Sequence, residues 1–159
     1  MIGNPVLSYA ILLITAGILF YAALTDLKQF CIPNELVIAL GGLFFVYALQ
    51  SGQWAGIPWH LGFAFAISLA MLFFYARGQM GGGDVKILAV AMLWVGIDCA
   101  LAFAILLLIF ASAHAAAAKL GWAAVQQDAG GRQQRIPFAP SVAGALIGTF
   151  MLGCLHPLP

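Results

Sequence analysis

The stretch QMGGGDVK, residues 79–86, separates two long apolar runs and determines how the rest of the chain is interpreted. Three consecutive glycines, Gly81, Gly82 and Gly83, are unfavourable inside a helix, so they indicate a break between two helices. Because another apolar run follows directly, the sequence places Asp84 at the start of a helix near the hydrocarbon boundary. An aspartate there is a functional-site hypothesis by default, and a glycine-rich turn with an N-cap aspartate is the simpler alternative.

The composition is that of an integral membrane protein. Hydrophobic residues make up 64% of the 159 residues and charged residues only 7%, whereas soluble proteins carry roughly 25% charged residues. The net charge of +1, without a basic stripe, argues against nucleic acid as a partner. Three scattered cysteines without CxxC spacing argue against a disulfide framework and against a zinc site.

Six apolar runs predict an all-α membrane protein, a bundle of about six transmembrane helices that forms a single domain over residues 1–159. The runs cover residues 5–24, 36–49, 58–76, 85–95, 99–118 and 138–155. The first lacks the features of a cleaved signal peptide and is interpreted as a retained helix. The fourth would give roughly 17 Å of helix, too short for a core of about 30 Å. Either the bilayer is thinner there, or the glycine stretch itself enters the membrane.

The basic residues predict the orientation of the bundle. All six lie in or beside the first, third and fifth connections: Lys28, Arg77, Lys86, Lys119, Arg132 and Arg135. By the positive-inside tendency these connections face the cytoplasm, and both termini lie on the outer side. Asp26, which follows the first apolar run, and Asp84 are then expected at the same, cytoplasmic face.

Two carboxylates that approach one another can activate a water molecule for peptide hydrolysis. The ionised carboxylate takes a proton from water while the protonated one donates to the scissile carbonyl, and no metal or covalent intermediate is required. Asp84 begins a helix, with Lys86 two residues further on, which favours its ionised form. Asp26 is expected beyond the end of the first helix, which favours the neutral acid. Alternatively, the two aspartates are unrelated boundary residues.

Three motifs in this order resemble those of the type IV prepilin peptidases, membrane aspartic proteases of the Gly-x-Gly-Asp class. Asp26 is followed by IPN at residues 32–34, then by MGGGDVK at 80–86 and IPFAP at 136–140. The resemblance implies that Asp26 and Asp84 are the catalytic aspartates, that no cofactor is needed, and that an active-site loop contains Gly81, Gly82, Gly83 and Lys86.

The resemblance also implies a substrate and a location. The substrate would be a prepilin or pilin-like precursor, cleaved after its leader at the cytoplasmic face of a bacterial inner (plasma) membrane. No region precedes the first helix where larger members carry a methyltransferase, so we expect no N-methylation. This short form resembles the peptidases of Flp-type (tight-adherence) pili.

Two other classes of protein are considered. Presenilin-like and signal-peptide-peptidase-like proteases share the Gly-x-Gly-Asp element but place a tyrosine before the other aspartate, where this chain has Thr25. A proton-coupled transporter or an assembly scaffold could use two aspartates, although carrier groups are expected near the membrane midplane.

Three further polar residues have structural explanations. Glu35 suits the first turn of a helix, where a negative charge is favourable. His114 is interpreted as a packed or snorkelling side chain rather than a proton relay. Cys31 lacks a neighbouring histidine base, which argues against a thiol protease.

Overall fold

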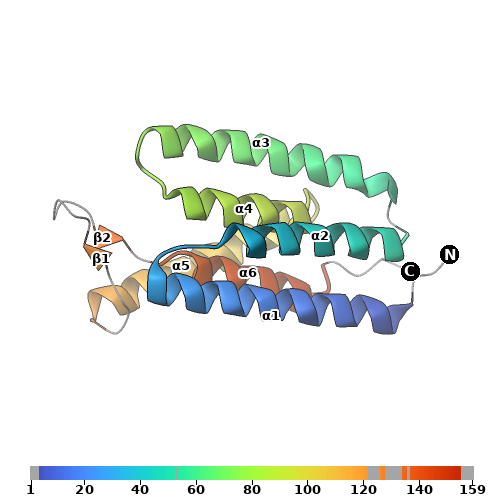
Figure 1. Ribbon diagram of the computed structural model, residues 1–159, viewed down its shortest axis with the longest axis horizontal. Helices are drawn as coiled ribbons and strands as arrows, with labels where there is room; N and C mark the ends of the chain where they lie inside the picture. Colours follow the sequence, from blue (N-terminus) through green and yellow to red (C-terminus); the bar gives the residue numbers. More distant parts are fainter. Residues whose placement is uncertain (1–3, 53, 122–125, 128–133, 136, 155–159) are drawn as a thin grey trace.

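The computed structural model describes residues 4–52, 54–121, 126–127, 134–135 and 137–154. Within these ranges the chain forms six α-helices that run along one long axis (Figure 1). Two strands of two residues each, β1 (Gln126–Gln127) and β2 (Gln134–Arg135), pair antiparallel between the last two helices. The helices are α1 (Pro5–Gln29), α2 (Asn34–Gln50), α3 (Ile57–Ala76), α4 (Gly82–Val95), α5 (Ala100–Lys119) and α6 (Ala139–Met151), and a short 3-10 turn (Trp54–Gly56) precedes α3. The predicted helical bundle is confirmed.

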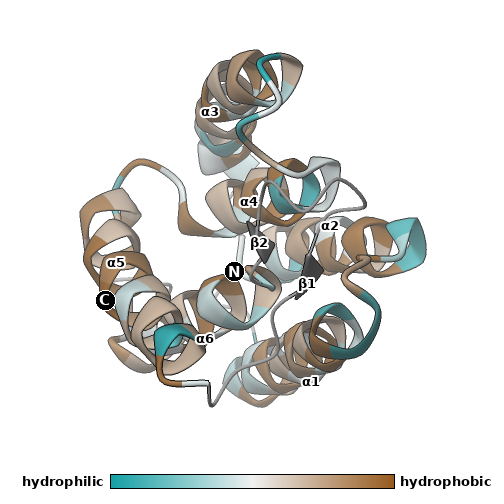
Figure 2. Cartoon of the chain, turned by 90° about the vertical axis from the view of Figure 1, so that its left-hand side faces the viewer, coloured by the Kyte–Doolittle hydropathy of each residue, from teal (hydrophilic) through white to brown (hydrophobic). Residues whose placement is uncertain are grey.

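The helices α4 and α6 form the centre of the bundle. The helix α6 packs against α1, α4 and α5, and α4 also packs against α2 and α3, so α3 is the outermost helix on its side (Figure 2). Trp94 of α4 is fully buried, and its indole N–H donates to the carbonyl oxygen of Leu40 at 3.0 Å. This hydrogen bond satisfies the polar atom of the largest side chain in the core.

The outer helices are apolar on the faces that they expose. Three segments are long and apolar enough to cross a membrane, namely α1, Trp54–Ala76 and α5, while α2 and α6 are shorter apolar helices. A helix that is apolar all round is typical of a hydrocarbon environment. The chain is therefore a multi-pass membrane protein, and its lipid-facing side chains include Phe65, Leu69 and Leu72 on α3 and Leu101, Ile105 and Leu108 on α5.

Three helix ends differ from the prediction by three residues or more. The helix α1 continues to Gln29, so Asp26 lies inside its last turn and not beyond it. The apolar run ends near Leu24, but the polar residues that follow include no proline or glycine to stop a helix. The helix α4 begins at Gly82 and spans about 21 Å, and α6 ends at Met151 instead of residue 155.

A disulfide joins Cys99, just before α5, to Cys154, just after α6. The Cα atoms are 5.9 Å apart although 55 positions separate the two residues in the sequence. The expectation that no disulfide forms is therefore wrong, because the fold brings together cysteines whose spacing carries no signal. Both lie at the end of the bundle opposite the glycine stretch, whereas Cys31 keeps a free, exposed thiol.

Removal of this disulfide should destabilise the protein without affecting chemistry at the opposite end. We expect Cys99→Ser to lower the free energy of unfolding by about 2–4 kcal/mol, because the crosslink restricts the unfolded chain. Thermal unfolding in detergent, with and without reductant, measures the effect. Cys31→Ser is the matched control and should unfold like the wild type, and an equal loss in both variants would contradict the assignment.

Candidate active site

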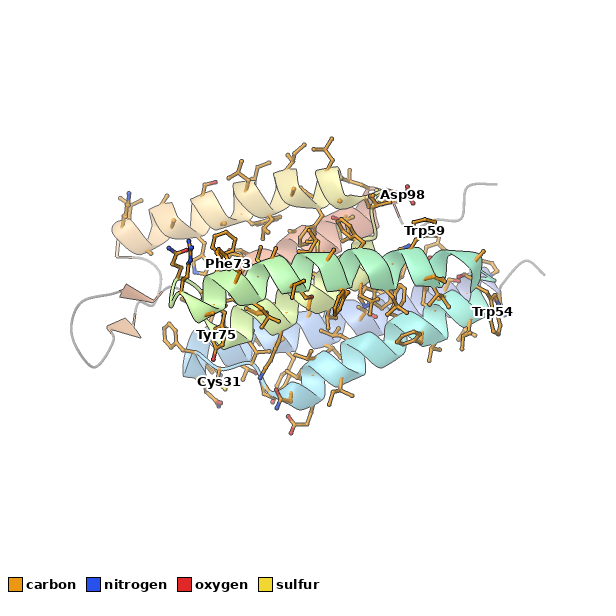
Figure 3. The ribbon with its side chains drawn as sticks, turned by 90° about the horizontal axis from the view of Figure 1, so that it is seen from above. Cys31, Trp54, Trp59, Phe73, Tyr75 and Asp98 are labelled. Carbon is orange, nitrogen blue, oxygen red and sulfur yellow. A yellow bond between two sulfur atoms is a disulfide. The ribbon has the colours of Figure 1, made fainter. Side chains whose placement is uncertain are left out.

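Hydrophilic residues gather at one end of the bundle. This end combines the last turns of α1, α3 and α5 with the first turns of α2, α4 and α6, and Figure 2 views the bundle from it. Asp26 of α1 and Asp84 of α4 both belong to it. Trp54, Trp59 and Asp98 lie at the opposite end (Figure 3), where tryptophan is typical of a membrane interface.

Asp84 occupies the third position of α4 and is half-buried. Gly81, not Asp84, is the N-cap residue, in an extended conformation (φ −74°, ψ 145°). The Gly81 N–H donates to Asp84 Oδ2 at 3.3 Å, so the carboxylate folds back over the start of its own helix. The positive end of the helix dipole and this N–H both favour a negative charge there.

The glycine stretch is partly helical rather than a loop, which corrects the prediction for Gly82 and Gly83. Both residues lie in the first turn of α4. A Cβ on Gly82 would lie 3.3 Å from the Tyr75 ring at the end of α3, and one on Gly83 would lie 3.6 Å from Ile32. The turn is therefore held between two neighbouring segments. Tyr75 and Cys31 mark this end of the molecule in Figure 3.

Lys86 does not turn toward the aspartates in the way that its proximity in sequence suggests. Its Nζ donates to Asn34 Oδ1 at 2.8 Å, which ties the start of α4 to the start of α2. The side chain of Lys86 is exposed. Asn34 belongs to the IPN motif, but the sequence did not indicate its bond to Lys86, because the two positions are 52 apart.

Asp26 is buried, with 5% of its surface exposed. Its Oδ2 accepts the backbone N–H of Ala139, the first residue of α6, at 2.9 Å. Both α2 and α6 pack against α1 and against α4, so the helices that carry the two aspartates flank the same pair of neighbours.

The sequence analysis used helix dipoles to predict that Asp84 is ionised and that Asp26 is the neutral acid, and these contacts remove the basis for that prediction. Asp26 lies within α1, and its carboxylate is placed at the N-terminus of α6. Asp84 is placed at the N-terminus of α4, and Lys86 bonds elsewhere. Each carboxylate therefore meets the positive end of a helix, and the dipoles no longer distinguish an acid from a base.

The other polar candidates lie around this end. Glu35 is exposed in the first turn of α2, as its predicted helix-dipole role requires. His114 is half-buried near the end of α5, with its Nδ1 3.4 Å from Ser141 Oγ on α6. Ile136, the first residue of the IPFAP motif, and Arg132 lie outside the described residues.

The fold and the site define a multi-pass helical membrane protein in which two aspartate carboxyl groups, each beside the N-terminus of a helix, lie at one polar end. The chain belongs to the type IV leader peptidase family, which matches residues 13–121. The predicted family is thus confirmed, and the match includes Asp26 and Asp84 but ends before α6.

A curated relative is the prepilin leader peptidase/N-methyltransferase of Bacillus subtilis (strain 168). It is 31% identical over 144 residues, which cover 86% of this chain and 53% of that protein. The chain therefore spans about half the length of this relative. No solved structure matches the chain significantly.

Proposed function

We propose that the chain is a membrane aspartic endopeptidase that removes the leader peptide of type IV pilin-like precursors, with Asp26 and Asp84 as the catalytic pair. The observation that carries the proposal is the placement of these carboxylates. They come from α1 and α4, lie at the same polar end of an otherwise apolar bundle, and fall within the family match. The name of the family supports leader peptides as the substrate class.

The chemistry would proceed through a water molecule held between the two carboxyl groups. One carboxylate takes a proton from the water while the water oxygen attacks the scissile carbonyl carbon. The other carboxyl group protonates the carbonyl oxygen. The resulting gem-diol collapses as its C–N bond breaks, and a proton passes to the departing amine nitrogen. The two groups exchange roles and titrate as a coupled pair.

The location of the pair suits cleavage at the membrane boundary. A precursor anchored by an apolar helix would present the junction with its leader at the polar end of the bundle, where both aspartates lie. We place this end at the cytoplasmic face of a bacterial inner membrane, because the basic residues of the described part of the chain gather there. Within the substrate class we propose Flp-type precursors, on the resemblance described above.

The test is processing in a host that lacks its own prepilin peptidase. The full chain is co-expressed with a tagged Flp-type precursor and, separately, with a longer type IV prepilin. Mass spectrometry of the product and its N-terminal sequence report leader removal and the bond cleaved. Cleavage of the Flp-type precursor supports the whole proposal, cleavage of only the longer prepilin contradicts the subclass, and cleavage of neither contradicts the function.

The proposed orientation predicts how the three cysteines react. Cys31 is free and exposed at the end that we place in the cytoplasm. A membrane-impermeant maleimide should therefore label it in inside-out vesicles but not in intact spheroplasts. After reduction, Cys99 and Cys154 should show the opposite pattern, because they lie at the other end. Labelling of Cys31 in spheroplasts would reverse the topology.

A further inference from the structure

The first turn of α6 has no side-chain cap of its own. The first N–H groups of a helix have no partner within the helix and need an acceptor when they are buried. Ala139 is 1% exposed, and its N–H bonds to Asp26, a residue 113 positions away on α1. The Asp26 carboxylate, one of the two proposed catalytic groups, thus also acts as the N-terminal cap of α6.

The IPFAP motif explains why this turn offers its donors to Asp26. Proline has no backbone N–H, so within Pro137–Pro140 only Phe138 and Ala139 carry donors. The Ala139 N–H donates to Asp26 Oδ2 at 2.9 Å, and the Phe138 N–H lies close enough to interact with the same carboxyl group. Pro137 is fully buried, which fixes the entry of the chain into the helix. The two prolines therefore leave two backbone N–H donors between them and restrict the direction in which these donors point.

A second contact anchors the same turn from the side of α5. Ser141, in the first turn of α6, is 3% exposed, and its Oγ lies 3.4 Å from His114 Nδ1. His114 is also close enough to Asp26 to interact with it electrostatically. Helices α1, α5 and α6 therefore meet around one carboxyl group.

We propose that the turn Phe138–Ser141 is a positioning element that holds the Asp26 carboxyl group for hydrolysis, and that His114 anchors this turn through Ser141. The inference rests on the proposed function, because it assigns Asp26 a catalytic role. Hydrogen bonds from N–H groups to a carboxylate are stronger than those between neutral groups and fix its direction. The motif would act through Asp26 and would not touch the scissile bond itself.

The first test removes one donor from the turn. Ala139→Pro deletes the N–H at the first helical position, which tolerates proline. The matched control is Ala100→Pro at the first position of α5, at the far end of the bundle. Residues 138 and 99, which precede the two positions, have φ and ψ of −100° and −27° and of −101° and 2°. Both conformations are disfavoured before proline, so both variants carry this backbone strain.

We expect Ala139→Pro to lower kcat for leader cleavage by about 10-fold or more, because a misdirected catalytic group is costly. KM should change little, and Ala100→Pro should keep near wild-type kcat. Equal losses in the two proline variants, or none in either, would overturn the proposal. If Ala139→Pro does not accumulate in the membrane, two variants of His114 test the proposal instead. His114→Leu should lower kcat several-fold and His114→Gln, which keeps a hydrogen-bonding atom, should restore most of it, and equal kcat in both would overturn the proposal.

A further readout is independent of activity. In protein labelled with 13C-carbonyl phenylalanine and 15N-alanine, the Phe138–Ala139 amide is one of five Phe–Ala amides, and it is assigned by its absence from the spectrum of Ala139→Gly. Its proton should resonate downfield and should move upfield in Asp26→Leu, and an unmoved resonance would overturn the contact. If the wild type cleaves no precursor, the proposed function fails and the positioning role fails with it, whereas the amide still reports whether the contact exists.

Discussion

Asp26→Asn and Asp84→Asn should each abolish leader cleavage while the protein still inserts and folds. Each substitution removes one of the two proton-transfer groups, and a positioned general acid or base is worth on the order of 10²–10⁴-fold in rate. Because the two groups act as one unit, the double variant should be no slower than either single variant. Cleavage of a co-expressed precursor, followed by mass shift over time, measures the loss.

Asp98→Asn is the matched control for this experiment. Asp98 is exposed at the opposite end of the bundle, so the same change of charge should leave cleavage at the wild-type rate (Figure 3). Asparagine can still accept the N–H of Ala139 through its amide oxygen, so Asp26→Asn should keep the fold. Normal processing by either active-site variant would disprove the catalytic pair.

The overall fold was predictable because the membrane imposes it. Backbone groups in hydrocarbon must be satisfied internally, so each apolar run had to be a helix. The same constraint made the site visible in the sequence, because Asp26 and Asp84 are rare ionisable groups beside long apolar runs. The structure places them in the last turn of α1 and the first turn of α4, which lie at the same end of the bundle. The pair β1 and β2 was not predicted, since such short strands leave no pattern in the sequence.

The ends of the helices were harder to predict than the helices themselves, because a helix can continue beyond the end of its apolar run. Residues 25–29 are mostly polar yet compatible with a helix, so α1 continues through Asp26. Gly82 and Gly83 are poor in a helix interior, but they occupy the first turn of α4, where neighbouring segments hold the backbone. Local propensity therefore placed the boundaries a few residues away from where packing puts them.

Contacts between residues far apart in the chain could not be predicted from the sequence. Asp26 meets Ala139 across 113 positions, Lys86 meets Asn34 across 52, and the disulfide joins residues 55 apart. Each depends on how whole helices pack, and none leaves a spacing that can be read from the chain. The IPFAP motif was visible as a motif, but its donors for Asp26 became apparent only in the fold.

Gly81→Ala should impair cleavage much more than Gly83→Ala, although the two glycines flank the same turn. A methyl group on Gly81 would lie 2.9 Å from Asp84 Oδ2, too close for the carboxylate to keep its place. Gly81 already has extended backbone angles that alanine adopts freely, so the helix itself should form. The substitution therefore displaces the reacting group and leaves the fold intact.

At Gly83 the same methyl group would lie 3.6 Å from the Ile32 side chain, which is ordinary van der Waals contact. We expect Gly83→Ala to cleave nearly as fast as the wild type. Gly81→Ala should lose about 10- to 100-fold in kcat, because even a small misplacement of a catalytic group slows the reaction. Thermal unfolding should be alike in the two variants. Equal kcat values would show that the glycine turn only links α3 to α4 and does not set the position of Asp84.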